Sequence, residues 1–176
     1  MTGKTEHREL TTRSGLRIHV RPATPADQAD LAEFFRHVTP DDLRFRFLGN
    51  VKIGEERLAE MTDVDHETTE SFIATDGRDG PIIALAMLAC DRELTTGEVA
   101  VSIRGDYKNR GIGWELLGFV TEVAAAKGVR RVQSLESRQN RDAIELEQER
   151  GFKARSYEGD ASLVLLEKAV TTAAHP

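Results

Sequence analysis

The segment from Lys108 to Gly113 carries the residues whose types and spacing best suit ligand chemistry. It reads Lys-Asn-Arg-Gly-Ile-Gly, so two glycines and two cations stand at the predicted start of a helix. The unpaired N–H groups of a helix's first turn and the helix dipole favour an anion at that point. Glycine lets the backbone approach the anion closely, and Lys108 and Arg110 add positive charge. The pattern predicts a site for phosphate or pyrophosphate.

Three nucleotide-binding interpretations of this turn compete. A dinucleotide fingerprint needs a third glycine three residues after Gly113, but that position holds Leu116. A Walker-type loop needs Lys followed by Ser or Thr, but Gly113 is followed by Trp114 and Glu115. A turn for the pyrophosphate of coenzyme A remains, next to the plain alternative that the glycine pair only starts a helix.

Strand and helix patterns alternate along the rest of the chain. Residues 16–21 alternate apolar and polar side chains, as a half-buried strand does, and Thr24 to Asp27 resemble the capped start of a helix. After a connecting segment at 40–48, we expect a helix at 54–61, strands at 71–74, 81–90 and 98–103, a helix at 111–127, a strand at 131–135, a helix at 142–150 and a hairpin of 152–157 with 162–166. This order predicts an α/β fold with a mixed sheet covered on both faces.

Composition sets the broad class. The chain has 176 residues, which suits one domain, flanked by flexible segments at 1–15 and 171–176. No apolar run approaches the ~20 residues of a membrane span, and no signal peptide precedes residue 16. A lone cysteine, Cys90, fits the cytoplasm. The net charge of −6 disfavours nucleic acid as a partner, and the five scattered histidines predict no metal site.

Two motifs together make the chain resemble the GNAT superfamily of N-acetyltransferases. The turn at 108–113 is similar to the family's Gln/Arg-x-x-Gly-x-Gly/Ala motif, with Lys108 in the first position. The segment from Asn140 to Phe152 is similar to its Asn-x-x-Ala-x-x-Leu-Tyr-x-x-x-Gly-Phe motif. The resemblance implies a GNAT fold over residues 16–170, with six to seven strands and about four helices. It also implies acetyl-CoA as co-substrate, its pyrophosphate held by main-chain amides of the turn.

A narrower resemblance concerns the acceptor and the base. The segments at 38–47 and 62–66 are similar to bacterial Pat-type protein lysine acetyltransferases, which implies a protein lysine as favoured acceptor. Glu98 stands thirteen residues before Gly111, where those enzymes place a general base. The alternative for Glu98 is a solvated residue at the edge of a strand, and Glu93 is the second candidate carboxylate.

The family resemblance also assigns cofactor contacts. It implies that the main chain of Val101 and Ile103 pairs with the pantetheine arm, and that Asn140 lies near that arm. The alternative for Asn140 is a helix N-cap, and the two roles are compatible. The predicted cofactor-binding residues are therefore Val101, Ile103, Lys108, Asn109, Arg110, Gly111, Ile112, Gly113 and Asn140.

One position departs from the family pattern. Glu147 stands where many relatives carry a Tyr that acts as general acid. An ordinary carboxylate is ionised at neutral pH and has no proton to give. We therefore expect Glu147 to be an exposed member of an acidic run with Glu145 and Glu149, without that role.

These features favour an acetyl-CoA-dependent N-acetyltransferase that works by direct transfer, as a monomer or homodimer, with no nucleic-acid or membrane partner. Two alternatives stay open. The acceptor could be a small-molecule amine, or the domain could bind coenzyme A without turnover, as a regulatory module.

Overall fold

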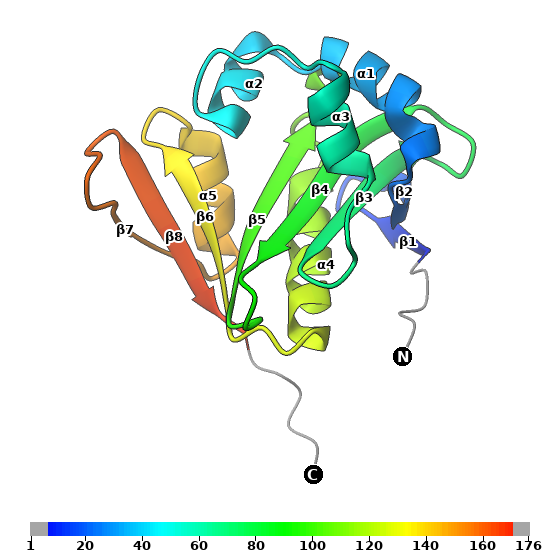
Figure 1. Ribbon diagram of the computed structural model, residues 1–176. Helices are drawn as coiled ribbons and strands as arrows, with labels where there is room; N and C mark the ends of the chain where they lie inside the picture. Colours follow the sequence, from blue (N-terminus) through cyan, green and yellow to red (C-terminus); the bar gives the residue numbers. More distant parts are fainter. Residues whose placement is uncertain (1–6, 171–176) are drawn as a thin grey trace.

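The computed structural model describes residues 7–170, which form one mixed sheet and its covering helices (Figure 1). The sheet has the strand order β1-β2-β3-β4-β5-β6-β8-β7, and every neighbouring pair is antiparallel except the parallel pair β5 and β6. The strands are β1 (Arg8–Thr11), β2 (Arg17–Pro22), β3 (Thr69–Asp76), β4 (Ile82–Cys90), β5 (Thr96–Ile103), β6 (Arg131–Ser137), β7 (Lys153–Ser156) and β8 (Leu163–Ala169). The predicted mixed α/β fold is confirmed, with eight strands rather than six or seven.

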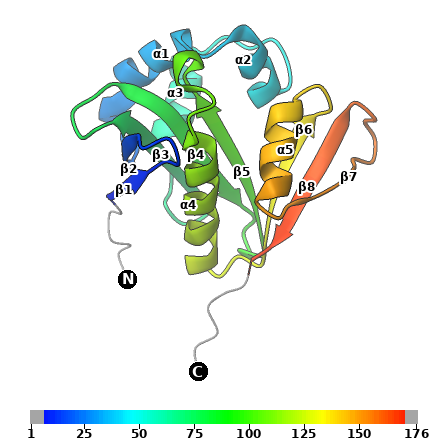
Figure 2. The same cartoon turned by 180° about the vertical axis from the view of Figure 1, so that it is seen from behind.

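Five α-helices cover the sheet in two layers. They are α1 (Gln28–Arg36), α2 (Pro40–Phe47), α3 (Glu55–Thr62), α4 (Ile112–Ala126) and α5 (Arg141–Glu149), with short 3-10 turns at Pro25–Asp27 and Gly105–Tyr107. The first three lie on one face, and α4 and α5 lie on the other (Figures 1 and 2). The longest described helix, α4, has 15 residues, and no helix within residues 7–170 is long and apolar enough to cross a membrane.

The core divides into two clusters, one on each side of the sheet. Phe34 of α1 packs with Leu85 of β4 on the side of α1 and α3, whereas Val120 of α4 belongs to the larger cluster on the other side. Because β4 lies in the middle and is covered on both faces, it is nearly continuously apolar and buried. This rigid centre supports β5, the strand that leads into the glycine turn.

The segment expected to connect two elements at 40–48 is the helix α2. Thr39 caps it, because its Oγ1 accepts a hydrogen bond from the Asp42 N–H at 3.2 Å, and Pro40 suits the first turn. Leu48 ends it in the left-handed conformation at φ 51°. None of its residues is fully buried, so no apolar stripe marked it in the sequence; its capping residues define it instead.

The flexible segment predicted over residues 1–15 is wrong from residue 8 onward. Residues 8–11 form β1, which pairs antiparallel with β2, and Thr12 is buried. Four residues with alternating partial burial give too weak a pattern to separate a short edge strand from a frayed end. Residues 1–6 and the predicted tail at 171–176 lie outside the described residues.

Candidate active site

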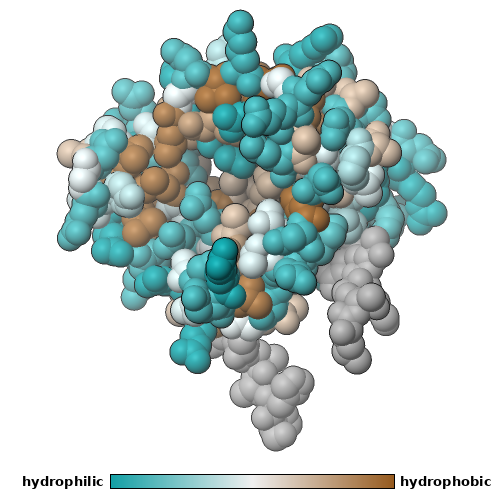
Figure 3. All heavy atoms as spheres, in the orientation of Figure 1, coloured by the Kyte–Doolittle hydropathy of each residue, from teal (hydrophilic) through white to brown (hydrophobic). Residues whose placement is uncertain are grey.

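The parallel strands β5 and β6 separate shortly after they meet, and a cleft opens between them. Their register covers only three residue pairs, from Thr96 with Arg131 to Glu98 with Gln133. Beyond Glu98, residues 99–103 keep β4 as their partner on one edge, and no β6 residue pairs with the other edge. The cleft has a volume of about 300 Å³, and the surface is hollowed there below α2 (Figure 3).

The glycine turn forms one rim of this cleft, and its two glycines are required for different reasons. Gly111 adopts φ +86°, a backbone conformation that side chains disfavour. Gly113 has no such φ, but a Cβ there would lie 2.9 Å from Leu146 Cδ2 and 3.3 Å from Ile103 Cδ1. The start of α4 therefore sits tightly against β5 and α5, with its first-turn backbone on the cleft.

The structure brings most of the predicted site residues together. The cleft is lined by Glu98, Val101, Ile103, Lys108, Asn109, Gly111, Ile112, Gly113 and Asn140. Lys108 lies 2.8 Å from a carboxylate oxygen of Asp42, which ties the turn to α2. Arg110 is not among the lining residues; its guanidinium lies 4.8 Å from the Tyr107 ring centroid. The second candidate carboxylate, Glu93, is exposed in the turn between β4 and β5, away from the cleft lining.

The segment after β1 holds the outer side of the glycine turn. The guanidinium of Arg13 lies 4.0 Å from the Trp114 ring centroid, and that of Arg150 lies at the same distance. Arg150 also donates two hydrogen bonds to the Trp114 carbonyl, and the Ser14 hydroxyl donates one to the Arg110 carbonyl. These contacts hold the glycine turn and the first turn of α4 on the side away from the cleft. Arg13 and Ser14, which were predicted to belong to a flexible segment, therefore support the site.

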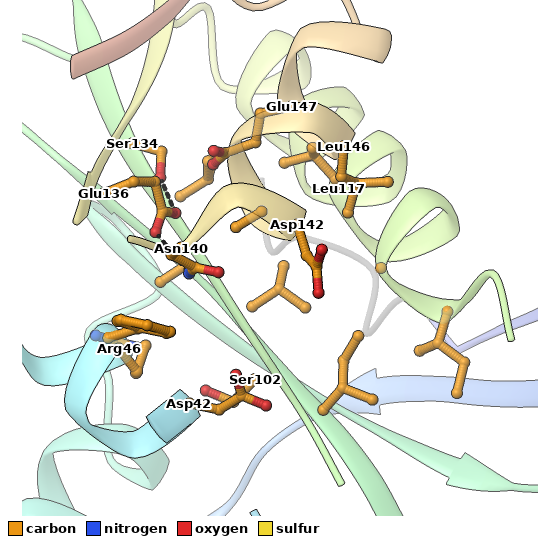
Figure 4. A pocket seen from close by; sticks show the side chains of 18 of the residues that line it. Asp42, Arg46, Ser102, Leu117, Ser134, Glu136, Asn140, Asp142, Leu146 and Glu147 are labelled. Carbon is orange, nitrogen blue, oxygen red and sulfur yellow. Dashed lines mark hydrogen bonds between the residues drawn. The ribbon is translucent and has the colours of Figure 1, made fainter. Parts of the chain in front are cut away.

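A cluster of polar side chains lies on the α5 side of the cleft, and sequence analysis missed it. Glu136 of β6 accepts hydrogen bonds from the Ser134 hydroxyl at 2.8 Å and from the Asn140 amide at 3.2 Å. Asn140 stands at the N-cap of α5, but its side chain binds Glu136 and makes no capping bond. Figure 4 shows the Glu147 carboxyl turned toward these residues.

Glu147 is buried, so the expectation of an exposed residue is wrong. It is 6% exposed, whereas its neighbours Glu145 and Glu149 are exposed on the other face of α5. The signal that could have found it is helical spacing: Ala143 and Leu146 stand four and one residues before it, on the face that lines the cleft. Its Oε2 atom is buried with no hydrogen-bond partner.

The carboxyls of Glu136 and Glu147 differ in their surroundings. Burial, and next to it the nearby negative charge of Glu136, raise the pKa of Glu147 to about 9. Burial also raises the pKa of Glu136, but hydrogen bonds from Ser134 and Asn140 and the charge of Arg46 oppose that shift. Both shifts favour the protonated form, and the larger of the two is that of Glu147.

The cleft shows no arrangement for a metal. Within residues 7–170, no group of three or more His, Cys, Asp or Glu side chains is placed to hold a metal ion. The chemistry available here is that of hydrogen bonds, main-chain amides and carboxyl groups, among which the exposed Glu98 and the buried Glu147 occupy different walls.

The site thus combines a mixed sheet whose parallel pair opens into a cleft with a glycine turn that starts a helix at the rim of that cleft. Residues 32–152, more than half of the chain, match the model of the Acetyltransferase (GNAT) family. The chain belongs to this family, which confirms the predicted resemblance, and it is an acyltransferase.

Several known proteins are similar to the chain. It is 27% identical over 154 residues to the acetyltransferase PA5475 of Pseudomonas aeruginosa, covering 86% of this chain and 83% of that protein. It is 30% identical over 123 residues to the acetyltransferase Pat of Mycolicibacterium smegmatis, covering 69% of this chain but only 37% of that protein's length. Among solved structures, the GNAT domain of S. lividans PAT superposes with a TM-score of 0.86 at 22% identity, covering 93% of this chain and 96% of that one.

The protonation of Glu147 predicts how stability changes with pH. Its pKa rises from an ordinary 4.5 to about 9 on folding, so its contribution to stability is complete below pH 4.5 and is lost as pH rises to about 9. The free energy of unfolding of the wild type should fall by up to about 1.4 kcal/mol per pH unit in this window. Glu147→Gln, which cannot ionise, should remove this slope in urea titrations at pH 5 to 9.

The matched control for this titration is Glu145→Gln, an exposed neighbour on the same helix. It should keep the wild-type slope. Equal slopes for the wild type and Glu147→Gln would show that the Glu147 carboxyl is ionised in the folded protein.

Proposed function

We propose that the protein transfers an acetyl group from acetyl-CoA to a primary amine, with a protein lysine as the favoured acceptor and Glu98 as general base. The observation that carries the proposal is the position of Glu98. It belongs to the last residue pair before β5 and β6 diverge, so its exposed carboxylate stands at the closed end of a cleft that has an anion-binding turn at its rim.

Two parts of the cleft, the glycine turn and the free edge of β5, suit two parts of acetyl-CoA. The first-turn amides of α4, at Gly111 to Gly113, face the cleft and suit the pyrophosphate, and Lys108 adds charge. The edge of β5 over residues 99–103 has main-chain groups without a β6 partner. The amide-rich pantetheine arm can pair with this edge as an added strand would, which places the thioester toward Glu98.

The chemistry then needs a neutral amine and a stabilised oxyanion. A lysine amine has a pKa near 10.4, so most of it is protonated at neutral pH and cannot attack. Glu98, directly or through one water, accepts the amine proton, an effect typically worth ~10²–10⁴-fold. A free main-chain N–H of β5 beside the thioester supplies the oxyanion contact.

The choice of acceptor rests on charge and on the relatives. Asp42, Glu98 and Glu136 line the cleft and would attract a cationic amine. The resemblance of the segments at 38–47 and 62–66 to Pat-type protein lysine acetyltransferases supports a protein lysine, with a small-molecule amine as the alternative in the same cleft. The protein works in the cytoplasm under this proposal, because a single cysteine, Cys90, cannot form an internal disulfide and suits a reducing compartment.

Gly113→Val tests the cofactor site. Its side chain would collide with Leu146 and Ile103 and displace the first turn of α4, so the Kd for acetyl-CoA should rise at least ~10-fold by isothermal titration. Gly49→Val is the control, because a Cβ at Gly49 meets nothing within 4 Å and that glycine lies outside the cleft lining. Melting curves should be measured for both variants, to check that each is folded. Equal affinities for the two variants would place the cofactor elsewhere.

Glu98→Gln tests the base. With a panel of lysine peptides and polyamines, thiol release should show kcat lowered ~10²–10⁴-fold while the Kd for acetyl-CoA is unchanged. Glu93→Gln, which changes an exposed carboxylate outside the cleft lining, should keep wild-type turnover. Full activity in Glu98→Gln would contradict its role. Wild-type binding of acetyl-CoA without turnover on any acceptor would favour the alternative of a regulatory coenzyme A-binding module.

A further inference from the structure

The cleft holds a second carboxyl group that the proposed function does not use. Glu147 lines the cleft from α5, whereas Glu98 lines it from β5. One is 6% exposed and the other is open to solvent. Where two carboxyls share one site and their surroundings differ this strongly, they take opposite parts in proton transfer. The buried group keeps its proton and the exposed group accepts one.

The surroundings of Glu147 explain why it keeps its proton. Ser134 and Glu136 face it from β6, and Asp142 belongs to the cleft wall on its own helix. From α2, the half-buried guanidinium of Arg46 acts on Glu136 and Glu98, and it donates to the Met87 sulfur at 3.7 Å. Among residues 7–170, no Lys or Arg forms an ion pair with Glu147, so no cation offsets a negative charge there.

We propose that Glu147 is the general acid of the reaction, giving its proton to the coenzyme A sulfur as the thioester breaks. This inference rests on the proposed acetyl transfer. The carboxyl is a buried member of the cleft wall, its Oε2 lacks a hydrogen-bond partner, and its neighbour Glu136 is held in place by Ser134 and Asn140.

The step balances in atoms and charge. The amine nitrogen attacks the thioester carbon, a C–N bond forms, and Glu98 takes the nitrogen's proton. As the tetrahedral intermediate collapses, the C–S bond breaks and its electron pair goes to sulfur. The Glu147 proton then moves to that sulfur, which gives the free thiol and leaves Glu147 as a carboxylate. Exchange with solvent returns a proton from Glu98 to Glu147.

The acidity of Glu147 matches this task. A thiol such as that of coenzyme A has a pKa near 8.5, so an acid with a pKa of about 9 transfers its proton to the thiolate with little free-energy change. At pH 7 such an acid is protonated by about a hundred to one. An ordinary glutamate, with a pKa near 4.3, would be ionised at that pH and could not act.

Glu147→Gln is the test variant, because its amide is neutral and similar in size to the protonated acid, but it has no acidic proton. We expect kcat at pH 7.5 to fall ~10²-fold with the KM for acetyl-CoA unchanged. We also expect the alkaline limb of the kcat–pH profile, near pH 9 in the wild type, to disappear. Glu145→Gln, exposed on the same helix, should match the wild type in both.

Glu136→Gln supplies an independent readout. It removes the negative charge that raises the pKa of Glu147, so the alkaline limb should move to lower pH. A merely structural role for Glu147 would not produce this shift. An unmoved limb in Glu136→Gln, or a Glu147→Gln variant that keeps the wild-type kcat and profile, overturns the acid role alone. A wild type that binds acetyl-CoA but turns over no acceptor overturns the proposed transfer, and the acid role with it.

Discussion

The site depends on the early separation of β5 and β6. Two parallel strands that pair over only three residues leave the remaining edge of β5 without a partner, and main-chain groups that lose a sheet neighbour need water or a ligand instead. β4 holds the other edge in full register, so the free edge of β5 is rigid. The start of α4 and the inner face of α5 line the same opening, which makes it a walled cleft with main-chain donors along one side.

Charge is distributed across the cleft in a way that suits acyl transfer to an amine. In the proposed function, the rim at the glycine turn holds the anionic pyrophosphate, and the closed end receives the amine near Glu98. The α5 wall is less accessible to water, and there a carboxyl group is more stable in its protonated form. The polar network of Ser134, Glu136 and Asn140, next to the buried Glu147, costs free energy that a purely apolar wall would save, which is typical of groups kept for function.

The sequence predicted the part of the cleft lining that lies on the glycine turn and on β5, because both are local patterns. Glycines that follow a strand and start a helix, with cations beside them, can be recognised within 16 residues. The network on α5 could not be recognised in this way, since its burial depends on β6 and α5 meeting across the cleft. Glu147 stands between exposed glutamates, and only its spacing from Ala143 and Leu146 indicates an inner face. β1 and α2 were missed because short or stripe-free elements carry weak periodicity.

The most direct test of the account is a crystal structure of the protein with acetyl-CoA bound. We expect the pantetheine arm beside residues 99–103 of β5 and the pyrophosphate within about 3 Å of the amides at Gly111 to Gly113. The thioester sulfur should lie between Glu98 and Glu147, within hydrogen-bond reach of the Glu147 carboxyl. A cofactor bound outside the cleft between β5 and β6, or a sulfur directed away from both carboxyls, would contradict it.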